Sequence, residues 1–368
     1  MVYGAGRYRE RFHEYSRLVA RGNIWIATSV TAFLLTTCLV LSKVAPHLVS
    51  RAFVGLALVA GVLLSGHLLR RIFYLQHQPF LAALSSLIYF ITVACGLIVV
   101  SQLKLLNSFS VFLVLASGWI TAALILGRKL RFGDKRKSFL QFEPNYWRIH
   151  WDYSKWVFLT ACVFQFTTQG YYWIVAYFLS AKDVAELRAM YILVTPVEQA
   201  FIAMVYLIVP ALAAHYTAKR VRAYRSLWER YAIASLIATA IFALVARAVG
   251  RPVVHVLYAG KYDTVVPILF LLAFLPFLMA IGHTLNSALI AAEKPQLVFF
   301  AFVCSGIATF GVGVPLVMRF GVQGAAYGML LSGATYTAAL ALAFIFRVNR
   351  HLSAMVAGSQ QVSEIETI

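Results

Sequence analysis

The amino-acid sequence predicts an all-α polytopic membrane protein with about ten transmembrane helices in two lobes. Its 368 residues are 61% hydrophobic and only 12% charged, with a mean hydropathy of +0.79. Soluble domains carry roughly 45–50% apolar and about 25% charged residues. The apolar residues come in repeated blocks of about 18 residues or more, long enough to cross ~30 Å of hydrocarbon. In lipid, such blocks satisfy their backbone hydrogen bonds as helices.

Ten blocks are predicted to span the membrane, and most connections between them are short. They group into an incomplete N-terminal lobe of four helices (1–127), a cytoplasmic amphipathic loop (128–155), a C-terminal lobe of six helices (156–346) and a cytoplasmic tail (347–368). The predicted spans are 24–44, 52–69, 80–100, 107–127, 156–178, 188–213, 230–249, 264–286, 296–317 and 323–346.

Lysine and arginine residues are distributed unevenly over the connections. With the N-terminus in the cytoplasm, 23 of the 32 lie on the cytoplasmic side and 9 on the other. This asymmetry follows the positive-inside rule, places both termini in the cytoplasm and accounts for the net charge of +19 without nucleic acid as a partner. The basic and aromatic loop 128–155 is predicted to lie at the membrane surface, with membrane lipids as its partners.

Two parts of the chain repeat the same order of features. A proline opens an apolar helix after Gln76–Pro79 and again after Ala292–Pro295, and each helix then carries a cysteine and a glycine. A basic run enters a helix earlier in each half. The first four spans therefore match the last four in the same orientation, as in two-lobed transporters built from parallel repeats. On this pattern a complete carrier of six and six helices would begin two helices earlier.

Several motifs resemble one family in their order and spacing. They are Leu69–Pro79, Val209–Leu212, Val256–Tyr262, Leu289–Pro295 and Phe320–Ala326. The chain is similar over nearly its whole length to the Wzx-like flippases of O-antigen and exopolysaccharide, which belong to the multidrug/oligosaccharidyl-lipid/polysaccharide exporter superfamily.

The resemblance implies a MATE/MurJ-like fold with the first two helices missing. It also implies a function, the flipping of a polyprenyl-pyrophosphate-linked oligosaccharide across the bacterial cytoplasmic (inner) membrane for surface polysaccharide biosynthesis. The further partners that it implies are a polysaccharide polymerase and glycosyltransferases. No catalytic residues follow from the family, so the chain is expected not to be an enzyme. The four cysteines form no CxxC pair or metal spacing, and neither a cofactor nor a metal is predicted.

Polar side chains inside the predicted spans mark a candidate substrate cavity, because they are costly to expose to lipid. Gln165 and Gln169 lie one turn apart, and so do His283 and Asn286. We expect all four to face the space between the lobes, where amides can bond sugar hydroxyls; the alternative is hydrogen bonding or packing between helices. Arg70 and Arg71 end the second span, where they either meet a pyrophosphate at the cytoplasmic mouth or only obey the positive-inside rule.

Glu198 is the only acidic residue well inside a predicted span. A titrating carboxylate could couple transport to protons, and a carboxylate paired with a nearby donor could equally be structural. The alternative functions are a drug or cation antiporter of the same superfamily and an N-terminally truncated or accessory, inactive member. A membrane glycosyltransferase or polymerase is disfavoured because the chain has no DxD motif and no large external loop.

Overall fold

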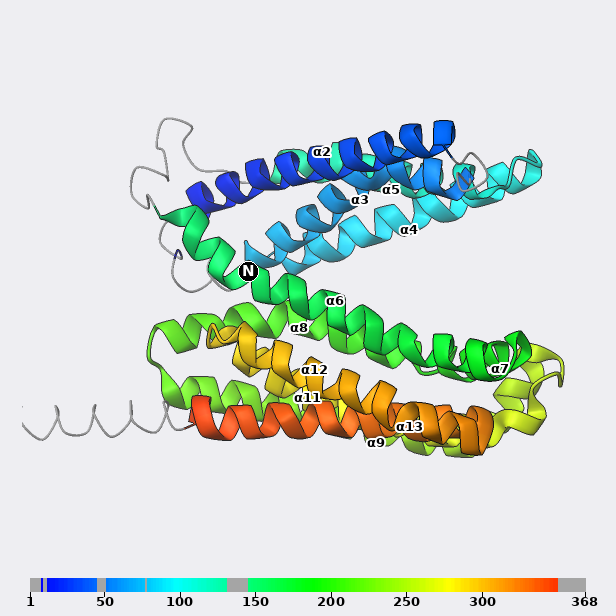
Figure 1. Cartoon of the computed structure of the whole chain (residues 1–368). Coiled ribbons are helices and arrows are strands. Elements are labelled where there is room, and N and C mark those ends of the chain that lie inside the picture. The colour runs from blue at the N-terminus through cyan, green and yellow to red at the C-terminus, as the bar shows by residue number, and fades with distance from the viewer. Residues whose placement is uncertain (1–7, 9–11, 45–50, 77, 131–144, 350–368) are drawn as a thin grey trace, which may run out of the picture. The chain divides into compact units, whose positions relative to one another are not determined.

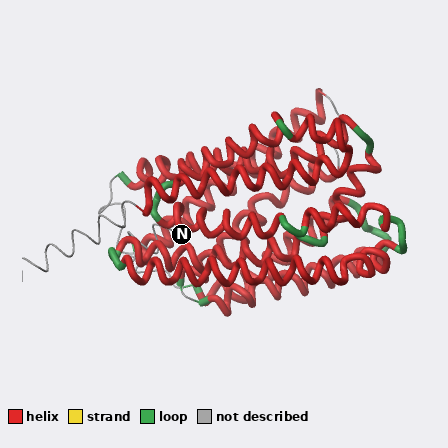
Figure 2. The backbone as a smooth tube through the Cα atoms, turned by 90° about the horizontal axis from the view of Figure 1, so that it is seen from below, coloured by secondary structure: helices red, strands yellow, loops and turns green. Residues whose placement is uncertain are grey.

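The computed structural model describes residues 8, 12–44, 51–76, 78–130 and 145–349. These residues form helices, turns and short connections, and no strand occurs among them (Figure 2). The chain divides into two compact units, residues 3–144 (unit 1) and 145–368 (unit 2). The predicted all-helical architecture in two lobes is therefore confirmed.

Unit 1 is a bundle of four long helices (Figure 1). Helix α3 packs against α2 and α5, and α4 packs chiefly against α5. An asparagine–serine capping box starts α5: Asn107 Oδ1 accepts from the Ser110 backbone N–H, and Ser110 Oγ accepts from the Asn107 N–H. The helices are α2 (Phe12–Val44), α3 (Arg51–Leu75), α4 (Pro79–Gln102) and α5 (Ser108–Leu126), followed by a 3₁₀ turn, η2 (Gly127–Lys129).

Unit 2 contains six passes, of which two are broken into consecutive helices. Pro196 and Pro276 lie in the first turn of the second helix of each broken pass. Proline loses no hydrogen bond there, because the first N–H groups of a helix have no acceptor within the helix. The elements are α6 (Tyr146–Phe178), α7 (Ala181–Ile192), α8 (Thr195–Thr217), α9 (Val221–Tyr258), η4 (Asp263–Val265), α10 (Val266–Leu272), α11 (Leu275–Ala291), α12 (Pro295–Gly311), α13 (Gly313–Ala343) and a terminal π-helix, η5 (Phe344–Asn349).

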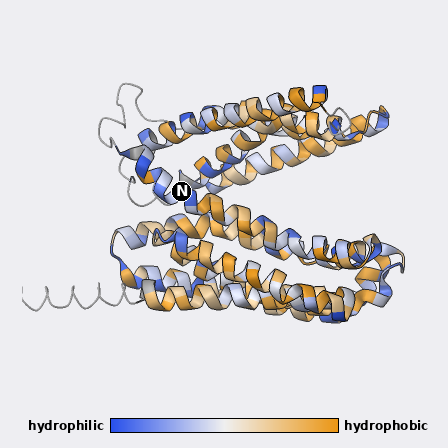
Figure 3. Cartoon of the chain, in the orientation of Figure 1, coloured by the Kyte–Doolittle hydropathy of each residue, from blue (hydrophilic) through white to orange (hydrophobic). Residues whose placement is uncertain are grey.

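Hydrophobic side chains lie along the middle of the helices, and hydrophilic ones lie mostly toward the helix ends (Figure 3). Among the residues that the structure describes, eight helices are long and apolar enough to cross a membrane. The other two predicted spans correspond to α12, which is apolar but only 17 residues long, and to α6, which carries amide and hydroxyl side chains in its middle. The chain is thus an integral membrane protein of many helices.

Several predicted boundaries differ from the helix ends by up to twelve residues. The predicted loop 128–155 is helical from Tyr146 onward, because α6 continues ten residues beyond its apolar stretch. Arg70 and Arg71 do not end α3, which continues to Leu75. Residues 131–144 of that loop and 350–368 of the predicted tail lie outside the described residues.

A short helical segment precedes the main part of α13. The break between the two falls at Gly321, whose φ of 59° and ψ of −137° are accessible to glycine but strained for other residues. After this break the chain folds back, so that a Cβ atom built on Gly324 would lie 2.0 Å from the carbonyl oxygen of Leu316. Glycine is therefore required at both positions of the turn.

The internal repeat is also present in the backbone conformation at the starts of α4 and α12. Helices α4 and α12 both begin with proline, and the residue before each proline has a φ of −114° with a ψ of 62° or 53°. Equivalent hydrogen bonds surround the two starts: Gln78 N–H to Phe73 O (2.9 Å) matches Lys294 N–H to Leu289 O (3.0 Å), and Leu81 N–H to Gln78 O (3.1 Å) matches Leu297 N–H to Lys294 O (3.2 Å). Each residue of the second set lies 216 positions after its counterpart.

Candidate substrate-binding sites

Unit 1 contains a small basic cavity of about 290 Å³ between α3, α4 and α5. The side chains of His67 and Arg70 line it from α3, together with Ser86 and Tyr89 from α4 and Trp119 from α5. The described residues that line it include one cation, Arg70, and no carboxylate. A cavity with a guanidinium, a hydroxyl and aromatic walls suits an oxyanion or a phosphorylated group.

Trp119 holds this cavity in shape. A Cβ atom built on Gly66 would lie 2.2 Å from the indole, so only glycine in α3 lets the ring lie flat against that helix. Tyr89 packs against the same indole with ring centroids 4.7 Å apart, and the imidazole of His67 lies at 5.5 Å. The tryptophan is 5% exposed, so its position is fixed by packing on several sides.

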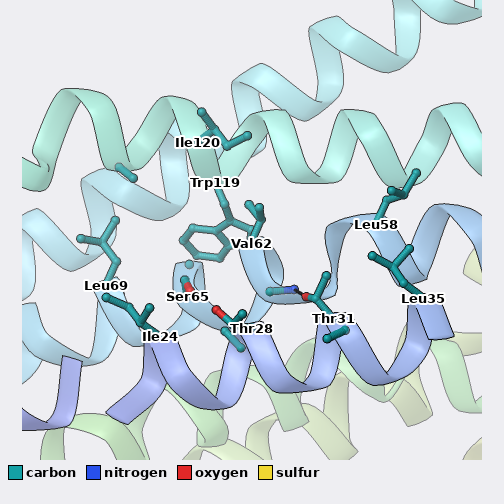
Figure 4. A pocket seen from close by; sticks show the side chains of 15 residues that line it. Ile24, Thr28, Thr31, Leu35, Leu58, Val62, Ser65, Leu69, Trp119 and Ile120 are labelled. Carbon is teal, nitrogen blue, oxygen red and sulfur yellow. Dashed lines mark hydrogen bonds between the residues drawn. The ribbon is translucent and has the colours of Figure 1, made fainter. Parts of the chain in front are cut away.

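A second cavity of unit 1, of about 600 Å³, shares Trp119 as part of its wall and lies between α2, α3 and α5 (Figure 4). Its lining is mostly aliphatic, with hydroxyls from Thr28, Thr31 and Ser65. Thr31 Oγ1 accepts a hydrogen bond of 3.0 Å from the backbone N–H of Gly61, which joins α2 and α3 closely. An apolar space with few hydroxyls suits hydrocarbon better than a charged group.

Unit 2 contains a cavity of about 450 Å³ lined chiefly by α6, α11, α12 and α13, with Tyr191 of α7 and Ile202 of α8. One of its walls is a chain of hydroxyl groups. Tyr171 Oη and Ser332 Oγ lie 2.8 Å apart, and Thr309 Oγ1 donates to Ser332 Oγ at 2.9 Å. Ser305 Oγ continues the chain to the Ser332 carbonyl at 3.0 Å. These groups bond to one another, so this wall is rigid and polar without being charged.

Other residues that line the same cavity offer polar atoms to a ligand. His283 Nε2 and Asn286 Oδ1 are buried and have no hydrogen-bond partner within the part of the chain that the structure describes. Phe302 and Tyr336 also line the cavity, with their ring centroids 4.2 Å apart and the ring planes tilted by 32°. An amide, an imidazole and aromatic rings are groups that can recognise sugar hydroxyls and sugar faces.

The 216-residue offset of the repeat relates the cavities of the two units. Both α3 and α11 carry glycine, then histidine, then a polar residue three positions further on. In each unit the glycine faces an aromatic ring of a later helix, Trp119 in α5 and Tyr336 in α13. The matched residues are Gly66 with Gly282, His67 with His283, and Arg70 with Asn286. Of these three matched positions, only the third differs, with a guanidinium in unit 1 and an amide in unit 2.

Three of the six predicted cavity residues line cavities: Arg70 in unit 1, and His283 and Asn286 in unit 2. Arg71 is exposed and lines none of the described cavities, and Gln165 and Gln169 do not line the cavity of unit 2. The prediction that these residues face the space between the lobes stays a prediction.

Sequence reasoning missed His67, Trp119 and the hydroxyl wall. His67 could have been predicted from the repeat, because the 216-residue offset between Pro79 and Pro295 makes it the counterpart of His283. No comparable signal exists for the contact between Tyr171 and Ser332, which are 161 residues apart.

Glu198 is 7% exposed, near the start of α8. The hydroxyl of Tyr191 lies 2.8 and 2.9 Å from its two carboxylate oxygens. Tyr191 lines the cavity of unit 2, whereas Glu198 does not. On its other side the Tyr191 ring meets Tyr172, over which the guanidinium of Arg188 lies at 5.0 Å. The carboxylate is thus one residue removed from the cavity, and its coupling role stays a prediction.

Tyr191→Phe is expected to lower the free energy of unfolding by about 1–3 kcal/mol, because it removes the hydrogen-bond donor of a buried carboxylate. Glu198→Gln should cost less, since the amide oxygen still accepts from Tyr191. The thermal midpoints of the purified variants in detergent measure both effects. If Glu198→Gln instead abolished transport at an unchanged midpoint, the carboxylate would be a coupling group.

No family model matches the sequence, and no curated protein matches it. Several solved structures are similar to this chain. An outward-facing multidrug resistance MATE family transporter of the MOP superfamily is similar with a TM-score of 0.79 and 11% identity, over 96% of this chain and 81% of that one. A mutant of the Vibrio cholerae MATE transporter VcmN has a TM-score of 0.77 and 14% identity, over 94% and 81%.

A third structure, a MOP superfamily transporter from Pyrococcus furiosus, has a TM-score of 0.75 and 10% identity, over 96% of this chain and 81% of that one. At such identities the likeness shows the fold alone. The fold is that of MATE family transporters of the MOP superfamily, which are membrane transport proteins and not enzymes.

Proposed function

We propose that this protein flips a polyprenyl-pyrophosphate-linked oligosaccharide across the bacterial cytoplasmic membrane for surface polysaccharide biosynthesis, with both termini in the cytoplasm. The observation that carries the proposal is the charge of the cavities. None of the four described cavities has a carboxylate in its lining, and Arg70 lines the small cavity of unit 1. Such cavities favour an anionic or neutral substrate over a cation.

The two repeat-related cavities suit the two chemically different parts of such a substrate. The guanidinium of Arg70 can form paired hydrogen bonds with phosphate oxygens, and His67 adds a donor beside it. The unpartnered His283 Nε2 and Asn286 Oδ1 can bond hydroxyl groups, while Tyr336 offers a ring face. The described lining of the unit 1 cavity thus offers a guanidinium, and that of the unit 2 cavity offers neutral polar groups.

The second candidate is a drug or cation antiporter of the same superfamily, which Glu198 favours. A buried carboxylate one residue from a cavity is a reasonable cation or proton site. Its contact with Tyr191 argues for a structural role, because the hydroxyl already bonds both oxygens. The Pyrococcus furiosus transporter has a binding pocket of reverse polarity, which suggests a different function for that protein. One fold can therefore carry pockets of either polarity.

Purified protein in proteoliposomes distinguishes the two functions. The lipid-linked oligosaccharide is first placed in both leaflets, and a membrane-impermeant glycosidase then removes the glycans that reach the outer leaflet. We expect digestion to continue beyond about half of the substrate only when the protein is present, and we expect a cationic dye such as ethidium not to be transported. Dye transport with digestion stopping at half would favour the antiporter and refute the flippase.

A further inference from the structure

A groove of about 630 Å³ lies on unit 2 between α9 and the broken pass α10–α11, and it shares no residue with the unit 2 cavity described above. We call it the α9–α11 groove. The groove forms where α9 carries small alanine side chains and where the opposite pass is broken between α10 and α11. The residues used below are Ala240, Ala243 and Arg247 of α9, Phe270 of α10, Phe274 in the break between α10 and α11, and Phe277 of α11.

The walls of the groove are almost wholly apolar. Ala240 and Ala243 of α9 have short side chains and so leave room for the groove, and Phe270, Phe274 and Phe277 form its other wall. Phe270, Phe274 and Phe277 are spaced four and three residues apart, so they share one face across the break between α10 and α11. Phe274 is 60% exposed and Phe277 is 40% exposed, so the described residues leave much of this wall uncovered.

One cation, Arg247, lines this apolar groove. Its guanidinium lies over the ring of Phe270, with 4.9 Å from Cζ to the ring centroid. None of the ion pairs among the described residues involves it. The cation–π contact fixes the guanidinium without using its N–H donors, which are left for an anion.

The position of Arg247 along α9 matches the depth of lipid headgroups. Arg230 and Arg247 bound the apolar part of the helix and are 17 residues apart, or about 26 Å at the rise of an α-helix. That length is close to the ~30 Å thickness of the hydrocarbon. From Arg247 the groove runs about 12 Å inward to the level of Thr239, over eight residues.

We infer that the α9–α11 groove binds an anionic phospholipid, with its phosphate at Arg247 and one acyl chain between the alanines and the phenylalanines. Charge complementarity selects this occupant, because a zwitterionic lipid gains less at a lone guanidinium. The site goes beyond the proposed function, since it lies outside the unit 2 cavity and holds a lipid that is not transported.

Native mass spectrometry of the full chain in detergent tests the inference, with phosphatidylglycerol and phosphatidylcholine of identical acyl chains as probes. Wild-type protein should retain phosphatidylglycerol in preference to phosphatidylcholine. Arg247→Gln should lower retention of phosphatidylglycerol about five-fold, as expected for one basic residue at the membrane surface, and Arg247→Lys should restore most of it. Ala243→Phe should also lower retention by filling the groove while leaving the charge in place.

Arg319→Gln is the matched control. Arg319 also lies over a phenylalanine, Phe320 at 5.4 Å, but it lines none of the described cavities. It should leave retention unchanged. Equal losses in Arg247→Gln and Arg319→Gln would mean only a general charge effect, and equal retention of the two lipids by wild-type protein would also overturn the inference. Thermal midpoints of the variants identify any that fail to fold, and flipping in the proteoliposome assay should continue in those that fold.

Discussion

Replacing Gly324 with alanine is expected to remove most of the folded protein. The added methyl group would lie 2.0 Å from the carbonyl oxygen of Leu316 and 2.9 Å from the backbone nitrogen of Val317. Both contacts are with backbone atoms, so no side chain can rotate away, and the short helix before Gly321 must move as a whole. We expect a loss of at least ~3 kcal/mol, the upper end for over-packed sites. This is a large part of the 5–15 kcal/mol that stabilises a typical domain.

The yield of monodisperse protein after size-exclusion chromatography measures this effect, together with the thermal midpoint. Gly311→Ala is the control, because it precedes the same short helix and a Cβ atom there would meet nothing within 4 Å. It should leave both quantities unchanged. A normal yield for Gly324→Ala would show that the segment does not fold back against α13 as described.

The second large effect is expected in transport. Arg70→Gln should lower the rate of flipping by about ten- to a hundred-fold, which corresponds to the loss of a charged hydrogen-bonding group worth 1.5–3 kcal/mol. Arg71→Gln removes the same charge from the next position, but Arg71 is exposed and lines none of the described cavities. It should therefore stay within about twofold of wild type, since surface charges contribute little.

The glycosidase assay in proteoliposomes measures both rates at equal protein content. Comparing Arg70→Gln with Arg71→Gln distinguishes loss of a binding site from a general effect of charge on topology, because both variants reduce the net charge equally. Equal losses in the two variants would remove the basic cavity of unit 1 from the transport path. A loss in Arg71→Gln alone would place the path on the exposed face of α3.

The fold was largely predictable because its dominant signal is local. An apolar block of membrane-spanning length forms a helix whatever its neighbours are, and Pro79 and Pro295 mark helix starts by their own chemistry. Boundaries were less predictable: Tyr146 begins α6 well before the apolar stretch, because amphipathic turns can extend a helix beyond the lipid.

The sites were only partly predictable, because they depend on contacts between distant residues. Arg70, His283 and Asn286 could be chosen from polarity alone. Gln165 and Gln169 share that polarity, yet on α6 it is Thr167, Thr168 and Tyr171 that line the cavity of unit 2. Only the packing of α6 against α12 and α13 decides between these neighbouring faces.

The offset of 216 residues has a consequence for the ancestry of the chain. The offset is the same for a helix-opening proline, a backbone turn and a histidine, all within residues 66–81 and 282–297, and it is 217 for the aromatic residues Trp119 and Tyr336. Duplication of one ancestral segment produces such a pattern. After duplication the framework stayed in register, while Arg70 and Asn286 came to differ by a full charge. An Asn286→Arg variant would place a guanidinium at the matched position of unit 2. Comparing the substrates that it and the wild-type protein transport would show what the difference between Arg70 and Asn286 contributes to specificity.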